Sequence, residues 1–154
     1  MAAKMGIDAK LFFKEGGRAE SADWTETENV RDLTLDLTKA EADATTRGNN
    51  GWRATLAGLK DGSVTFDMVW DPDDAGFAAI SGSYLNNEKI GLSIMDGAIA
   101  TGTGLQGDFA IINFTRNEPL EDTITVSVVA KLTYSTSAPI WLDEGSEATG
   151  TDTY

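Results

Sequence analysis

Four aspartates gather in the segment FDMVWDPDDAGFAAI, residues 66–80, where carboxylates could serve three different purposes. They could bind a hard cation, act as an acid/base pair, or mark the start of a helix. The four are Asp67, Asp71, Asp73 and Asp74. An acid/base pair is disfavoured because neighbours such as Asp73 and Asp74 point in different directions on a helix.

A calcium loop of the EF-hand type fails here at two required positions. Such a loop needs oxygen ligands at positions 1, 3 and 5, a glycine at 6 and an acidic residue at 12. Counted from Asp71, position 3 is Asp73 and position 6 is Gly76. Position 5 is Ala75, however, and position 12 is Gly82. We predict no metal site at this segment, and loose cation binding is the weaker alternative.

The start of a helix explains the aspartates best. The apolar residues that follow have the spacing of one helical face: Phe77, Ile80 and Tyr84. Asp71 precedes Pro72 and is placed to cap the first amide groups, with proline at the first helical position. Asp73 and Asp74 would then lie in the first turn, where the helix dipole favours carboxylates. The sequence predicts a helix over about residues 72–85, capped by Asp71 and Asp74.

Histidine and cysteine are both absent from the 154 residues. This excludes Ser-His-Asp and Cys-His catalysis, disulfides, and zinc sites built on these ligands. An enzyme would have to rely on carboxylates, lysine, tyrosine or serine, for example a glycosidase pair, and nothing in the chain forces two carboxylates into one pocket. We predict no catalytic residues and no cofactor.

The charge balance is strongly acidic, with 25 acidic and 12 basic residues and a formal net charge of −13. Such a field repels phosphate backbones, so nonspecific binding of nucleic acid by a basic patch is not expected. The first residues lack the apolar core of a signal peptide, and no window has the roughly 18 apolar residues of a membrane span. We expect no membrane anchor and synthesis in a cytoplasm.

Apolar residues alternate with polar ones in several segments, which is typical of half-buried strands. The predicted inward sets are Leu33, Leu35 and Leu37; Val64, Phe66, Met68 and Trp70; Ile90, Leu92 and Ile94; and Ile124, Val126, Val128, Ala130 and Leu132. Residues 107–117 are apolar on both faces, and 9–14 and 51–59 are shorter candidates. With turns expected at Asp61-Gly62 and Asp96-Gly97, the pattern predicts an antiparallel β-sandwich or barrel with one flanking helix.

The segments between these strands are predicted to be irregular. Residues 38–62 and 96–108 are rich in glycine, threonine or asparagine and are typical of long mobile loops. Residues 1–8 are expected to form a flexible arm, and residues from about 143 an acidic tail that is disordered unless a partner orders it. All of residues 1–154 are assigned to one domain.

Two motifs have both a structural and a functional interpretation. Gly102, Gly104 and Gly107 nearly match a dinucleotide-binding GxGxxG, but the segment that follows has a strand period, so nucleotide binding is not predicted. Trp52 lies between Arg47 and Arg53 in a glycine-rich loop. It could pack under its own loop or anchor a neighbouring subunit, with the arginines either solvated or in intersubunit ion pairs.

The order of these elements resembles the major tail tube proteins of long-tailed bacteriophages. The matching pieces are LTLDLTKAEADATTRG, GWRATLAGL, SVTFDMVWD, DDAGFAAI and FTRNEPLEDTITVSVVAKLT. The resemblance spans about residues 9–142.

The resemblance implies a homo-oligomer of rings, each of six subunits, stacked into a tube through which DNA passes without specific binding. It also implies other tail proteins as partners, such as the tape measure, tail tip and terminator, and a place in the virion tail after synthesis in the host cytoplasm. Six copies at −13 each give a ring a formal charge of −78, which suits a conduit for DNA. We expect the subunit interface to include Arg47, Gly48, Trp52, Arg53, Gly102 and Gly104.

Two other function classes remain open at this point. A carbohydrate-binding or adhesin-like sandwich would be a stable monomer with an aromatic platform, for which Trp24, Trp52 and Trp141 would have to converge. Other virion or secretion-tube proteins would share the tube architecture.

Overall fold

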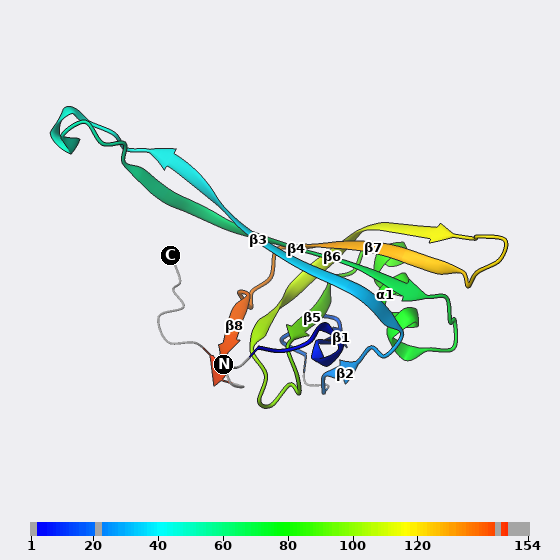
Figure 1. Ribbon diagram of the computed structural model, residues 1–154. Coiled ribbons are helices and arrows are strands. Elements are labelled where there is room, and N and C mark those ends of the chain that lie inside the picture. Colours follow the sequence, from blue (N-terminus) through cyan, green and yellow to red (C-terminus); the bar gives the residue numbers. More distant parts are fainter. Residues whose placement is uncertain (1–2, 21–22, 144–145, 148–154) are drawn as a thin grey trace.

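Figure 1 shows the computed structural model, in which residues 3–20, 23–143 and 146–147 are described. Within them the chain forms nine strands, one α-helix and two short 3-10 turns. The helix α1 is Ala75–Asn86, and the turns η1 and η2 are Gly6–Asp8 and Arg47–Asn49. The strands are β1 (Lys10–Glu15), β2 (Thr25–Glu26), β3 (Val30–Asp43), β4 (Thr55–Val69), β5 (Ile90–Met95), β6 (Gly104–Asn117), β7 (Thr125–Leu132), β8 (Ile140–Asp143) and β9 (Ser146–Glu147).

The strands form a single antiparallel sheet that curls into a half-barrel. Its order is β2-β1-β5-β6-β7-β4-β3, and β8 adds to β6 and in turn pairs with β9. Strand β6 pairs with β8 over Gly104–Gln106 and with β7 from Phe109 onward. The mostly β architecture with one helix agrees with the fold predicted from the sequence.

The main core fills the concave side of the curled sheet, with α1 packed against it. The predicted inward sets are confirmed for most strands: Val64, Phe66, Met68, Ile90, Leu92, Ile94, Val126, Val128 and Ala130 are all buried. From the helix, Phe77 and Ile80 enter the same cluster. Phe77 packs edge-on against Trp70, with 4.9 Å between the ring centroids. A smaller cluster on the other face joins Phe12, Met95 and Leu142.

The helix begins three residues later than predicted. Asp74 is its N-cap, and its Oδ2 accepts a hydrogen bond from the backbone N–H of Phe77 at 2.9 Å. Asp71, expected to cap the helix, belongs instead to the preceding turn, where its Oδ1 accepts from the Asp73 N–H. Both aspartates are suitable N-cap residues by type. Asp74 is the one that caps the helix, because it lies three residues before Phe77 and can accept from the Phe77 N–H. The helix ends at Asn86, and its C-cap Asn87 has left-handed backbone angles.

A β-bulge explains why β6 has apolar residues on both faces. Ile111 pairs with Ala130 and Asn113 pairs with Val129, so Ile112 is the extra residue between them. Phe109 and Ile111 face the core before the bulge, and Phe114 packs against the core after it. Ile112 itself is exposed. The two-sided apolar pattern thus comes from a switch of face within one strand.

The predicted turn at Asp61-Gly62 is wrong, and of the predicted loop over residues 38–62 only residues 44–54 lie outside the strands. Strand β4 runs without interruption through Asp61 and Gly62, which pair with Thr38 and Leu37 of β3. Gly62 makes room between side chains, because a Cβ there would lie 3.0 Å from Leu132 Cδ1 and 3.1 Å from Leu37 Cδ2. Glycine here therefore relieves crowding within a strand. Leu37, predicted to point inward, is 49 % exposed.

The predicted arm and tail each include described residues with regular structure. Asp143, assigned to the acidic tail, ends strand β8, in which the preceding Leu142 is buried. Of the remaining tail, residues 144–145 and 148–154 lie outside the described residues. In the predicted N-terminal arm, residues 1–2 also lie outside them, and residues 6–8 form η1.

Candidate assembly interface

Strands β3 and β4 extend beyond the rest of the sheet as a two-stranded arm, which we define as residues 37–62. β7 pairs with β4 only over Ser63–Val69, so the arm lacks a third strand. In Figure 1 it projects from the body, with its tip far from every other element. A lone two-stranded ribbon is marginal in water, which makes the arm a segment expected to gain support from another chain.

The arm exposes large apolar side chains along its length. They are Leu37, Trp52, Leu56 and Leu59. Trp52 is 78 % exposed at the tip, so the sequence-based alternative in which it packs under its own loop is wrong. A glycine in the arm supports close pairing, since a Cβ at Gly58 would lie 3.2 Å from the Ala40 carbonyl oxygen. Apolar groups that no intramolecular packing covers are typical of a contact surface.

The tip loop, residues 44–54, is held by local hydrogen bonds. Thr45 Oγ1 accepts from the Ala54 N–H at 2.9 Å, and the Thr45 N–H donates to Asp43 Oδ1 at 2.9 Å. Hydrogen bonding to Asp43 by the Thr45 side chain, and then by the Thr45 backbone N–H, holds the pKa of Asp43 below its usual value. Asn50 and Gly51 turn the chain with positive φ angles of 54° and 84°. The conformation of the tip loop is therefore held by hydrogen bonds among residues 43–54 themselves.

The loop presents two arginines beside the exposed tryptophan. Arg47, Trp52 and Arg53 line a shallow hollow of about 590 Å³. Within the described residues neither arginine forms an ion pair. Gly48 lies in η2 next to Arg47 and is exposed. The structure thus brings together four of the six residues predicted for the interface.

Gly102 and Gly104 lie elsewhere, buried in the body. The Gly102 N–H donates to the Ala98 carbonyl oxygen at 2.7 Å, which closes the connection between β5 and β6. A Cβ at Gly104 would lie 1.7 Å from the Ile94 carbonyl oxygen. Both positions need glycine for close backbone approach, and the structure does not bring them near the arm tip.

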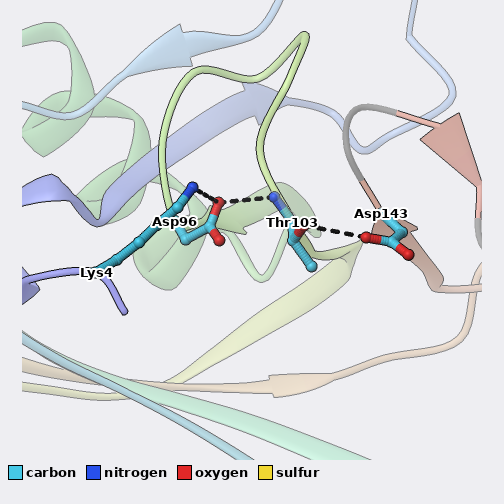
Figure 2. A network of polar contacts seen from close by, with 4 residues as sticks. All are labelled: Lys4, Asp96, Thr103 and Asp143. Atoms are coloured by element: carbon cyan, nitrogen blue, oxygen red, sulfur yellow. Dashed lines mark hydrogen bonds and ion pairs between the residues drawn. The ribbon is translucent and has the colours of Figure 1, made fainter. Parts of the chain in front are cut away.

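A polar network at the same connection joins both ends of the chain to it. Figure 2 shows that Asp96 Oδ1 contacts Lys4 Nζ at 3.3 Å and accepts from the Thr103 N–H at 2.8 Å. The Thr103 hydroxyl reaches Asp143 Oδ1 at 3.3 Å. Donation by the Thr103 N–H, helped by Lys4, holds the pKa of Asp96 below its usual value. Sequence reasoning missed this network because its members are far apart in the chain.

The convex face of the sheet is polar over β6, β7, β4 and β3. Cross-strand pairing sets Thr115 beside Ser127, and Ser127 beside Asp67. The Ser127 hydroxyl donates to Asp67 Oδ1 at 2.9 Å. The other residues that this pairing places on the face are Asn113, Asn117, Thr125, Val129, Lys131, Ala110, Val69, Thr65, Ser63, Asp61, Thr34, Asp36 and Thr38. Among these paired residues the charged ones are Asp36, Asp61, Asp67 and Lys131.

One carboxylate is buried in the body. Asp108 is 1 % exposed, and its Oδ1 accepts a hydrogen bond from the Arg18 backbone N–H. Its Oδ2 is buried without a hydrogen-bond partner. Gly17 packs directly against it, with a φ of 117° and a hypothetical Cβ 3.0 Å from Asp108 Oδ1. The carboxylate holds the turn after β1 against β6. In the sequence, the only sign of a buried carboxylate here is that Asp108 follows Gly107 in an otherwise apolar segment.

The described residues contain no group of three or more acidic side chains arranged to hold a metal ion. None of their helices is long and apolar enough to cross a membrane.

The chain is thus a mostly β protein, with a curled antiparallel sheet, one packed helix and a long projecting hairpin. The phage tail tube protein family model matches residues 6–134, so the chain belongs to this family. No curated protein matches the chain.

Solved structures share the fold at low sequence identity. A chain in the tail of an empty gene transfer agent particle with C6 symmetry aligns with a TM-score of 0.71 and 17 % identity, over 86 % of this chain and 96 % of that one. The SPP1 tail tube aligns with a TM-score of 0.67 and 16 % identity, over 93 % and 82 %. A chain of the anti-feeding prophage baseplate, 6-fold symmetrised, aligns with a TM-score of 0.59 and 6 % identity, over 93 % and 97 %.

Proposed function

We propose that copies of this chain assemble into rings of six that stack into the tube of a phage tail, through which DNA is ejected. The arm is the observation that carries the proposal. It exposes four large apolar side chains on a ribbon that only its own two strands support. The symmetry named for two of the similar structures, C6 and 6-fold, supports six copies per ring.

Free strand edges support the association of copies side by side. β3 is the last strand of the sheet, and a groove of about 630 Å³ separates its first residues from β1 and β2 at the opposite end. An unpaired edge of fourteen residues is a template for another strand, and natural proteins rarely leave such an edge free. Edge-to-edge pairing of six half-barrels would close a ring.

The polar convex face is the surface that we assign to the channel. Its hydroxyl and amide groups and its aspartates offer DNA phosphates little attraction, and Lys131 is the one cation among the paired residues named above. A channel through which DNA moves should not hold the phosphates, because each phosphate contact adds to affinity. The opposite face is filled by the core and α1 and has no room for such a role.

This function carries expectations about place and partners. The chain would be made in the host cytoplasm and end in the virion tail, without a membrane anchor. Its partners would be further copies of itself and the tape measure, tail tip and terminator proteins. The role is structural and needs neither enzymatic activity nor a cofactor.

A monomeric carbohydrate-binding or adhesin-like module is less well supported. Its aromatic platform would need Trp24, Trp52 and Trp141 on one surface. Trp24 packs in the small cluster beneath Lys14, which lies 4.7 Å from its ring centroid, and Trp141 packs against the main core. Trp52 lies alone at the arm tip, so the three do not converge.

Size-exclusion chromatography at several concentrations, combined with negative-stain electron microscopy, tests the proposal. Hollow tubes or six-fold rings are the expected result, with a tail-tip preparation added if nucleation is slow. A monomer at every concentration, with and without the tail tip, would refute it.

A further inference from the structure

The two ends of the long sheet carry opposite charges. The tip loop, residues 44–54, contains Arg47 and Arg53 and no acidic residue. At the opposite end lie residues 71–74 and 118–122, which we call the acidic end. Six of these nine residues are acidic and none is basic: Asp71, Asp73, Asp74, Glu118, Glu121 and Asp122.

The two segments of the acidic end lie side by side. The Trp70 N–H donates to the Ile124 carbonyl oxygen at 2.9 Å, which joins the start of one segment to the end of the other. In Figure 1 the turn between β6 and β7 lies on the side of the body away from the arm. Asp74 is engaged in capping α1, and Glu118 pairs with Arg116 at 2.6 Å. Glu121 and Asp122 form no ion pair within the described residues.

Each end also has an exposed apolar residue among its charges. Trp52 adjoins Arg53 at the tip, and Leu120 is 99 % exposed beside Glu121 at the acidic end. The tip therefore has an apolar residue among basic ones, and the acidic end has an apolar residue among acidic ones. The two surfaces are complementary in charge. Complementary charge of this kind selects partners and sets their orientation.

The two surfaces cannot meet within one copy. Strand β4 alone separates them by its fifteen residues, Thr55–Val69. At roughly 3.3 Å per residue this is a span of about 50 Å. Contact between them must join different copies, and because the two surfaces differ, the contact is head-to-tail and leaves a free surface of each kind at the two ends of an assembly.

We propose that the arm tip of one copy docks on the acidic end of another, with Trp52 against Leu120 and with Arg47 and Arg53 facing Glu121 and Asp122. This inference rests on the proposed function, because it requires that copies assemble. It adds a defined receptor for the tip and a polarity for the assembly.

Two charge-reversal variants test the docking. The tip-reversed variant carries Arg47→Glu and Arg53→Glu, and the end-reversed variant carries Glu121→Arg and Asp122→Arg. Each alone sets like charges against each other, so we expect the concentration needed for assembly to rise at least tenfold. In an equimolar mixture the two variants can alternate, which sets opposite charges at every contact, so the mixture is expected to assemble as the unmodified protein does. All four positions are exposed, so circular dichroism should show an unchanged fold.

A control variant, Glu15→Arg with Glu88→Arg, changes the net charge as the end-reversed variant does, but at exposed positions outside the acidic end. It should assemble without rescue. If the unmodified protein assembles and the mixture does not, or if either reversal alone has no effect, the docking is overturned while the proposed function stands. If the unmodified protein forms no larger species even with a tail-tip preparation, both are overturned.

Discussion

Thr27 lies directly against Gly76 in the first turn of α1. A Cβ at Gly76 would lie 2.8 Å from Thr27 Cγ2 and 2.9 Å from Thr27 Oγ1. Thr27 is buried in the connection between β2 and β3, so the contact holds the helix against the segment that leads into β3. Glycine at position 76 is therefore required by packing, although it is a poor helix former.

Two alanine substitutions in α1 should have opposite effects on stability. Gly76→Ala should lower the free energy of unfolding by about 1–3 kcal/mol, because the new methyl group crowds buried Thr27. Gly82→Ala should raise it by roughly 0.5–1 kcal/mol, because nothing lies within 4 Å of a Cβ there and alanine favours the helix. Urea denaturation of both variants measures the difference. Equal changes in the free energy of unfolding of the two variants would contradict the packing explanation.

The N-cap assignment predicts unequal effects for two neighbouring aspartates. Asp74→Ala should destabilise the protein by about 1 kcal/mol, because the Phe77 N–H loses its acceptor. Asp71→Ala serves as the matched control and should cost less, since Asp71 is exposed and bonds only within the preceding turn. Thermal unfolding followed by circular dichroism would reveal the order. A larger loss of stability for Asp71→Ala would instead support Asp71 as the cap, as predicted from the sequence.

The residues that face the core were predictable from the sequence wherever apolar and polar residues alternate along a strand without a shift. Val64, Phe66 and Met68 alternate cleanly and are all buried, because nothing interrupts the pairing of β4 with β7. Periodicity failed at Ile112, where a bulge shifts the pattern by one residue. Local sequence does not specify a bulge, since it depends on how two paired strands bend together.

The length of the arm was not predictable for a related reason. Asp61-Gly62 is a strong turn signal in isolation, but Gly62 fits between Leu37 and Leu132, which come from distant segments. Arg47, Trp52 and Arg53 could be proposed as interface residues because two arginines beside a tryptophan are unusual in an acidic chain. Leu120 was missed because a single leucine in a charged turn carries no pattern.

The Asp96 network should make stability depend on pH in the acid range. The Thr103 N–H, together with Lys4, holds the pKa of Asp96 below its ordinary value of 3.8 in the folded protein. A carboxylate with a lowered folded pKa adds stability above its unfolded pKa, and this contribution is lost as the pH falls through the folded value. The stability difference between the unmodified protein and Asp96→Asn should therefore be constant near neutral pH and shrink below about pH 4. Urea titrations at a series of pH values would measure it, and a difference that grows on acidification would contradict the assignment.

Trp52 should matter for assembly and not for folding. Because its side chain is exposed at the arm tip, Trp52→Ala should leave the unfolding midpoint within error of the original. Loss of an aromatic anchor should still raise the concentration needed for tube formation about tenfold or more. Tyr134→Ala removes another exposed aromatic residue, from the segment after β7, and should affect neither quantity. Equal assembly of the two variants, measured by sedimentation, would remove Trp52 from the interface.

The assignment of the polar face to the channel can be tested by chemical access, because the chain has no cysteine of its own. Thr65 is exposed on the polar face, and Leu85 is exposed on α1 at the other side of the sheet. Thr65→Cys should react with a bulky polymer-linked maleimide in the free subunit and lose that reactivity in assembled tubes, since the polymer cannot enter a narrow channel. A small maleimide should still react in tubes. Leu85→Cys should react with the bulky reagent in both states, so equal protection of the two cysteines, or none for Thr65→Cys, would place the polar face outside the channel.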